Sequence, residues 1–124
     1  SEREWQKERG GTWDKGKSGD TFGPTGPYLV TSDELENVQN LSMSLDIDGK
    51  RMQTGNTSKM IFSIDFILSY LSNFMSLQPG DIVTTGTPPG VGDGMSPKQF
   101  LKVGNKLCLK IEHLGKQSPT VVAE

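Results

Sequence analysis

Residues 41–47 show the most regular alternation of apolar and polar side chains in the chain. The apolar positions are Leu41, Met43, Leu45 and Ile47. A period of two predicts a strand with one buried face. Asp48-Gly49 follows, a pair that suits the positive φ of a tight turn, so residues 51–54 are expected to return as the antiparallel partner. The segment therefore predicts a β-hairpin.

A second pattern, with helical spacing, occupies residues 64–75. Its apolar positions are Ile64, Ile67, Leu68, Leu71, Phe74 and Met75. They form one continuous stripe, which predicts an amphipathic helix over Ile64–Met75. Ser63 suits the N-cap, and Pro79-Gly80 ends the helical pattern. We expect the stripe to pack in a core rather than to bind a cofactor.

The remaining elements are short. Further strand candidates cover 28–31, 82–85, 107–112 and 119–122. Segments 16–27 and 86–97 are rich in glycine and proline, which indicates long loops. With five or six strands and one main helix, the predicted fold class is β-rich α+β. Because the first 20 residues are mostly polar and carry no periodic element, we interpret residues 1–124 as a single partial domain.

Composition excludes some functions without identifying one. The 124 residues have a formal net charge of −2 and no basic run, which gives no support for binding nucleic acid or an anionic membrane. No apolar run is long enough to span a membrane. The single cysteine allows no internal disulfide, so we expect a reducing compartment, the cytoplasm.

Residues 11–18, Gly-Thr-Trp-Asp-Lys-Gly-Lys-Ser, match the P-loop pattern G-x-x-x-x-G-K-[ST]. A P-loop needs a buried strand before it and a helix after it, so that backbone amides converge on phosphate. The charged residues 4–9 do not suit a buried strand, and the glycines and prolines of 19–27 do not suit a helix. Nucleotide binding is therefore disfavoured.

Other chemically reactive residues are isolated in the sequence. Cys108 is expected on the outward face of its strand and His113 in a turn, so they do not indicate a nucleophile pair. The aspartates are scattered without the spacing of metal ligands.

Three segments spread along the chain carry a more specific signal. Residues 1–6 read Ser-Glu-Arg-Glu-Trp-Gln, and residues 16–27 read Gly-Lys-Ser-Gly-Asp-Thr-Phe-Gly-Pro-Thr-Gly-Pro. Gln78-Pro79-Gly80-Asp81 is followed by residues 85–92, Thr-Gly-Thr-Pro-Pro-Gly-Val-Gly. Together with Gly55-Asn56-Thr57 between them, these segments resemble the fumarylacetoacetate hydrolase family over nearly the whole chain.

The resemblance implies a family-type fold, a mixed β-sheet roll with one main helix, in a homodimer or higher homo-oligomer. The implied chemistry is C–C bond hydrolysis, decarboxylation or enol–keto isomerisation of small 2-oxo acids such as acylpyruvates, oxaloacetate or hydroxyheptadienedioate. Members of the family bind Mg²⁺ or Mn²⁺ through two glutamates and an aspartate. The matching positions would precede Ser1, so we expect these ligands outside the chain and expect the chain alone to be inactive.

The same resemblance gives roles to residues that are present. Gln6 matches a glutamine that contacts substrate or the catalytic water, and Lys17 matches the site lysine of the family. Thr87, beside Gly86, matches a threonine that binds the substrate carboxylate or carbonyl. Because long loops on a rigid sheet can meet, the loops that carry Lys17 and Thr87 are expected to converge.

Arg3 and Thr21 have supporting roles in this resemblance. Arg3 matches an arginine that braces the metal-site neighbourhood, and Thr21 with the backbone of Lys17 matches an accessory cation site. Cleavage beside a 2-oxo group builds negative charge on an enolate oxygen, which a lysine ammonium can stabilise. On the residues alone, a solvated loop lysine is the favoured interpretation of Lys17, and only the resemblance favours a catalytic role.

Two other functions stay open at this stage: a non-catalytic binding module with the same fold and, less favoured, a P-loop nucleotide binder. Calorimetric titration with Mg-ATP is expected to show no binding, because neither the strand nor the helix of a P-loop is predicted around residues 11–18. Titration with Mg²⁺ alone is the control. A micromolar dissociation constant for the nucleotide would contradict the family interpretation.

Overall fold

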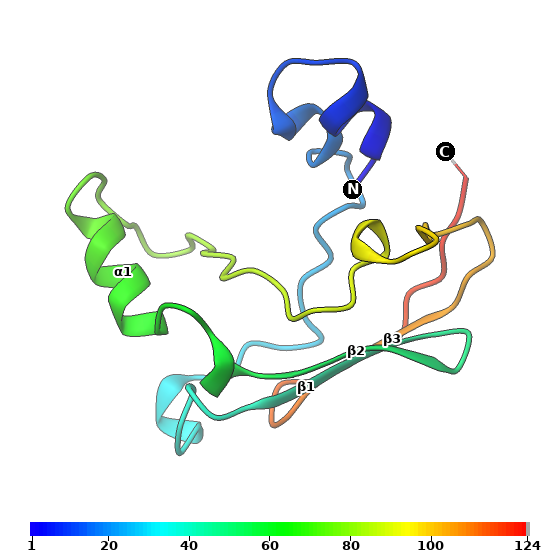
Figure 1. Cartoon of the computed structure of the whole chain (residues 1–124). Helices are drawn as coiled ribbons and strands as arrows, with labels where there is room; N and C mark the ends of the chain where they lie inside the picture. The colour runs from blue at the N-terminus through cyan, green and yellow to red at the C-terminus, as the bar shows by residue number, and fades with distance from the viewer. Residues whose placement is uncertain (124) are drawn as a thin grey trace.

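The computed structural model describes residues 1–123, and a four-stranded sheet lies at its base (Figure 1). The strands are β1 (Ser42–Ile47), β2 (Lys50–Asn56), β3 (Leu107–Ile111) and β4 (Gly115–Gln117), in the order β2-β1-β3-β4. All neighbouring pairs are antiparallel. A mixed sheet would also contain a parallel pair, and no such pair occurs within residues 1–123.

The predicted hairpin is confirmed. Its turn lies at Asp48 and Gly49, whose φ angles are 49° and 79°. Strand β2 is longer than the expected return at 51–54, and the register shifts between Leu45 and Asp46 of its partner. The shift leaves one extra residue, Met52, on β2, and such bulges bend and twist an edge strand.

The sheet has one apolar and one polar face. Across the β1–β3 ladder, Met43, Leu45 and Ile47 pair with Ile111, Leu109 and Leu107. We call the side that carries these residues the apolar face. On the other side, Asp46 lies opposite Cys108 and forms an ion pair with Arg51, with 2.5 Å between Oδ1 and Nε. Cys108 therefore lies on the polar face, as predicted.

The main helix, α1 (Ile64–Ser72), begins where predicted but ends before Met75. Ser63 is the N-cap, and its Oγ accepts a hydrogen bond from the Phe66 N–H at 3.2 Å. At the other end, the Asn73 amide donates to the carbonyl oxygens of the last turn, at 3.0 and 3.4 Å. These bonds satisfy carbonyl groups that a longer helix would have paired, so the predicted end was wrong by three residues.

Helix α1 stands away from the sheet (Figure 1). In its apolar stripe, Ile64, Ile67 and Leu71 are half-buried and the other positions are exposed. A second row of aromatic rings is also exposed and stacks along the helix, with centroid separations of 4.9, 6.1 and 5.0 Å. This row is Phe62, Phe66, Tyr70 and Phe74. The expected core packing of the helix is not observed. No helix among residues 1–123 is long and apolar enough to cross a membrane.

Several predicted strands do not form. Segments 28–31 and 82–85 are irregular, and segment 119–122 is reduced to one bridge between Lys106 and Thr120. Strands are stabilised by pairing, and 28–31 and 82–85 find no neighbouring strand among the described residues. Ile82, for example, is 69% exposed. Three of the expected strands therefore form, as β1, β2 and β3, and β4 was not predicted. The small α+β architecture itself was predicted.

The accessible surface of the structure is large for its length. It measures 9638 Å², whereas a compact monomer of this mass would expose about 6,500 Å². Leu41 is the one large apolar side chain that is buried within residues 1–123. The fold is therefore held mainly by hydrogen bonding and by contacts on the apolar face.

Thr57 is a buried hydroxyl with two partners. Its Oγ1 accepts a hydrogen bond from the Leu41 N–H at 2.8 Å and donates to the Val38 carbonyl at 2.9 Å. These bonds fix the segment that enters β1 against the segment that leaves β2.

Replacing Thr57 with valine is expected to lower the free energy of unfolding by about 1–3 kcal/mol, because the buried Leu41 N–H and the half-buried Val38 carbonyl would each lose a hydrogen bond. Urea unfolding of the full-length protein measures the change. Thr54→Val, at an exposed site on β2, is the matched control. Equal stability of the two variants would show that the Thr57 hydroxyl does not contribute.

Candidate functional site

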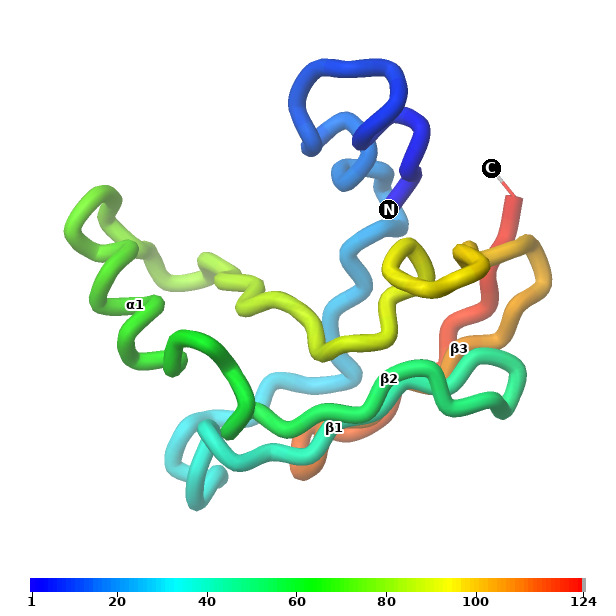
Figure 2. The backbone as a smooth tube through the Cα atoms, viewed as in Figure 1, coloured from blue at the N-terminus to red at the C-terminus, as the bar shows by residue number. Residues whose placement is uncertain are grey.

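Residues 1–18 form a small unit that lies apart from the sheet (Figure 2), and we call it the N-terminal unit. It contains two helical turns, η1 (Glu4–Glu8) and η2 (Trp13–Gly16), which pack on each other. The Glu2 N–H donates to the Gly16 carbonyl at 2.8 Å. The turn η1 thus precedes the P-loop-like segment 11–18, and η2 lies inside it. A P-loop would instead follow a buried strand.

Gly16 allows the close contact between these two turns. A Cβ atom at this position would lie 2.7 Å from both the backbone nitrogen and Cβ of Gln6. Real Cβ atoms do not approach other atoms so closely, so glycine is the residue that fits. The contact brings Gln6 and Lys17, which follows Gly16, into one unit.

Lys17 also lies near the start of the chain. The positive charge of Lys17 is close enough to the backbone nitrogen of Ser1 to act on it. The Lys17 side chain itself is exposed, and its backbone N–H donates to Asp14 at 2.9 Å. The ammonium group is therefore available to a ligand at the end of the unit that contains Ser1.

Thr87 lies in the irregular segment after residues 82–85, and the strand predicted to deliver it is absent. Instead, Gln53 of β2 holds it: the Gln53 amide donates to Thr87 Oγ1 at 2.9 Å and to the Pro88 carbonyl at 2.6 Å. Because the hydroxyl oxygen already accepts from Gln53, its own hydrogen is free to donate. Gly86, beside it, is exposed and has φ of 97°.

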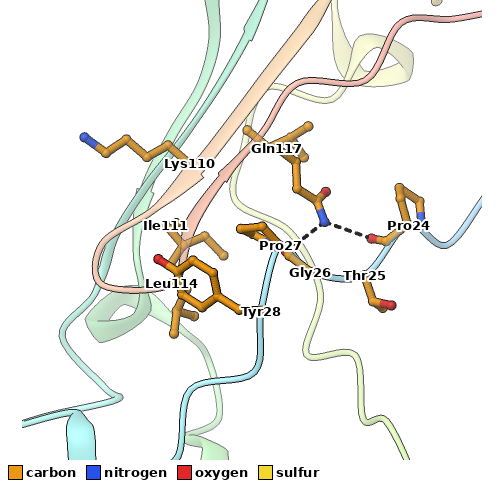
Figure 3. A pocket seen from close by; sticks show the side chains of 11 residues that line it. Pro24, Thr25, Gly26, Pro27, Tyr28, Lys110, Ile111, Leu114 and Gln117 are labelled. Atoms are coloured by element: carbon orange, nitrogen blue, oxygen red, sulfur yellow. Dashed lines mark hydrogen bonds between the residues drawn. The ribbon is translucent and has the colours of Figure 1, made fainter.

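The other glycine-rich loop is held in the same way at the far end of the sheet. Gln117 of β4 donates to the carbonyl of Gly26 at 2.8 Å and to that of Pro24 at 3.4 Å (Figure 3). Tyr28 and Leu114 lie beside these bonds, in a cavity of about 300 Å³ between the loop and the sheet. Loops 16–27 and 86–97 are thus both fastened to the apolar face by glutamine amides.

The predicted convergence of the two loops stays a prediction. No hydrogen bond joins Lys17 to Thr87 in the described structure. The N-terminal unit instead contacts loop 86–97 through Asp93, which pairs with Arg3 at 3.2 Å and with Lys7 at 2.6 Å. No sequence pattern distinguishes Asp93 from the other scattered aspartates, and its flanking glycines are the one local signal.

Arg3 has a second contact in this region. Its guanidinium lies 5.6 Å from the centre of the Phe100 ring, within the range of a cation–π interaction. Its Nη1 is buried and has no hydrogen-bond partner among residues 1–123. Arg3 therefore braces the contact between the N-terminal unit and the segment that follows Asp93.

The remaining candidates are not assembled into a centre. Thr21 is exposed in a turn. His113 has φ of 62° in the β3–β4 turn, and Cys108 lies on the polar face of β3. Within residues 1–123, no three His, Cys, Asp or Glu side chains gather as metal ligands. The described residues therefore do not fit the carboxylate triad that the resemblance implies.

Comparison with known proteins identifies the family. Residues 1–122 match the family model described as fumarylacetoacetate (FAA) hydrolase C-terminal. The chain belongs to this family. Among proteins of the family, a Burkholderia lata protein named "Putative hydrolase" is 58% identical over 118 residues, which are 94% of this chain and 42% of the relative. The chain thus spans less than half the length of this relative.

Solved structures of the family have the same fold. A fumarylacetoacetate hydrolase from Exiguobacterium antarcticum is 36% identical, with a TM-score of 0.93 over 98% of this chain and 43% of its own. A maleylpyruvate hydrolase from Sphingobium sp. SYK-6, in complex with manganese(II) and pyruvate, is 34% identical, with a TM-score of 0.76 over 83% of this chain and 36% of its own.

The substitution Gly16→Ala is expected to separate η1 from η2, because the new Cβ would overlap the backbone of Gln6. Hydrogen exchange of peptides from residues 1–18 should then become faster in the full-length protein. Gly23→Ala is the control, since a Cβ there meets no atom within 4 Å. Unchanged protection in the Gly16 variant would rule out the tight packing of Gln6 on Gly16.

Proposed function

We propose that the protein containing this chain is a fumarylacetoacetate hydrolase-family enzyme that cleaves the C–C bond one carbon removed from the 2-keto group of a small 2-oxo acid, so that the electron pair stays on the carbon beside that keto group as an enolate. The packing of Gln6 on Gly16, the residue before Lys17, is the observation that supports the proposal. It is supported by the manganese and pyruvate in the related maleylpyruvate hydrolase. Isomerisation and decarboxylation proceed through a similar enolate, so the same residues would serve them.

Lys17 is proposed to stabilise the negative charge that develops on the enolate oxygen as the bond breaks. A fixed ammonium stabilises such charge more in the transition state than in the ground state, which accelerates the reaction. Gln6 is proposed to orient the substrate or the attacking water through its amide. Their positions on one small unit would let both side chains act on the same small molecule.

Thr87 is proposed to bind the substrate carboxylate. Its hydroxyl accepts from Gln53, which turns the hydroxyl hydrogen toward any other acceptor. The exposed Gly86 leaves room for a ligand to approach the backbone beside it. Substrate held between Thr87 and Lys17 would place its carboxylate and its keto group on two different loops.

A divalent cation, Mg²⁺ or Mn²⁺, is part of this proposal, but its main ligands must come from outside the described residues. Thr21 and the Lys17 carbonyl are neutral oxygens and are proposed only as an accessory site, since Mg²⁺ sites generally use carboxylates. A homodimer or higher homo-oligomer in the cytoplasm also remains proposed. A non-catalytic module would keep the loops but lack turnover.

Lys17→Ala is expected to lower kcat by about 10²-fold in the full-length protein, the usual cost of losing one group that stabilises developing charge. Acylpyruvates, oxaloacetate and hydroxyheptadienedioate, assayed with Mg²⁺ or Mn²⁺, form the substrate panel. Lys15→Ala removes the same charge two residues away and is the matched control. If the wild-type protein turns over none of these substrates, the catalytic proposal is wrong. If the wild-type protein is active and Lys17→Ala has the same kcat, the proposed role of Lys17 is wrong.

A further inference from the structure

Asp93 receives three cationic side chains. Lys7 Nζ lies 2.6 Å from Asp93 Oδ2. Lys98 Nζ lies 2.8 Å and Arg3 Nε lies 3.2 Å from Asp93 Oδ1. Lys98 follows directly after the loop, five positions from Asp93, whereas Lys7 is 86 positions away in the sequence. One carboxylate therefore joins two distant segments of the chain.

These contacts are the polar connection between the N-terminal unit and the remainder of the structure. Within residues 1–123, every hydrogen bond and ion pair recorded between residues 1–18 and later residues ends on Asp93. The Arg3–Phe100 contact adds to the same junction. Figure 1 shows the loop that carries Asp93, in yellow, between the N-terminal unit and the sheet.

The loop holds Asp93 in a defined position. The Gln99 N–H donates to the Gly92 carbonyl at 3.0 Å, and the Gly94 N–H donates to the Val91 carbonyl at 3.0 Å. A Cβ atom on Gly92 would overlap the Gln99 carbonyl oxygen, so only glycine permits this closure. Asp93 therefore lies in a closed turn rather than on a free chain.

We propose that Asp93 is a positioning residue, whose carboxylate locks the unit that carries Gln6 and Lys17 onto the loop that carries Thr87. The inference rests on the proposed function and adds a residue that holds the N-terminal unit and the Thr87 loop in one relative placement. Gln53 fixes Thr87 on the sheet, and Asp93, six residues later, fixes the N-terminal unit to the same loop. Substrate that contacts both loops requires this relative placement.

The ionisation of Asp93 suits a permanent lock. Hydrogen bonds from Lys7 and then Lys98, with the added charge of Arg3, hold the pKa of Asp93 well below its usual range. A carboxyl group with a depressed folded-state pKa contributes stability above its unfolded-state pKa, and this contribution is lost only as the pH falls through the folded-state value. Asp93 is therefore ionised, and the lock is closed, at neutral pH.

Single ion pairs on a surface contribute little to global stability, so the lock should act on placement rather than on folding. Small displacements of groups that bind substrate can lower rates by about 10²-fold. Asp93→Asn keeps the shape of the side chain and removes the charge. We therefore expect a fall of about tenfold or more in kcat/KM with little change in the protection of the sheet.

The test uses hydrogen exchange of the full-length protein, followed by kinetics. Asp93→Asn and Lys7→Gln should both accelerate exchange in peptides from residues 1–18, while peptides covering β1 and β2 stay protected. Lys98→Gln removes a cation from the same carboxylate but keeps the ion pairs of Asp93 with Arg3 and Lys7. This variant should therefore change exchange much less. Asp46→Asn, which breaks an ion pair on the polar face of the sheet, is the charge control.

The outcomes separate this proposal from the proposed function. Faster exchange in residues 1–18 in Asp93→Asn, with restoration by Asp93→Glu, supports the lock even if the panel of 2-oxo acids shows no turnover. Wild-type exchange in residues 1–18 in both Asp93→Asn and Lys7→Gln overturns the lock. In an active enzyme, unchanged kcat and KM in Asp93→Asn would overturn its positioning role.

Discussion

The arrangement of the candidate site depends on two glutamine side chains on the apolar face of the sheet. Gln53 lies opposite Leu45, and Gln117 lies opposite Leu109, so both amides project among apolar neighbours. Each donates to two oxygen atoms of an irregular loop. Loops have no ladder of their own, and backbone carbonyl groups near an apolar surface need a donor. The two amides therefore fix long loops that would otherwise have many conformations.

The sequence predicted the parts of the fold whose stability is local. The alternation from Leu41 to Ile47 and the Asp48-Gly49 turn predicted the hairpin, and Ser63 predicted the start of α1. Elements that need a distant partner were predicted less well. Segments 28–31 and 82–85 have the composition of strands, but composition does not supply the neighbouring strand. The end of α1 was missed because the Asn73 side chain competes for the last carbonyl groups.

The candidate site was predicted to a different extent. Spacing and composition alone favoured a solvated role for Lys17, and only the resemblance to a family pointed to Gln6, Lys17 and Thr87. The roles of these three residues stay a prediction. Asp93 could not have been found in this way, because an ion pair across 86 positions leaves no periodic pattern. Such contacts follow from the tertiary fold, which local sequence patterns do not encode.

The large accessible surface also has a thermodynamic consequence. The heat-capacity change of unfolding and the slope of stability against denaturant both scale with the surface newly exposed. A chain that already exposes 9638 Å², including the aromatic row along α1, has less left to expose. These residues, taken alone, would therefore unfold with a broad, shallow transition. The same segment covered by additional chain or by a second subunit would unfold sharply, so cooperativity itself reports whether the apolar surfaces of α1 are covered.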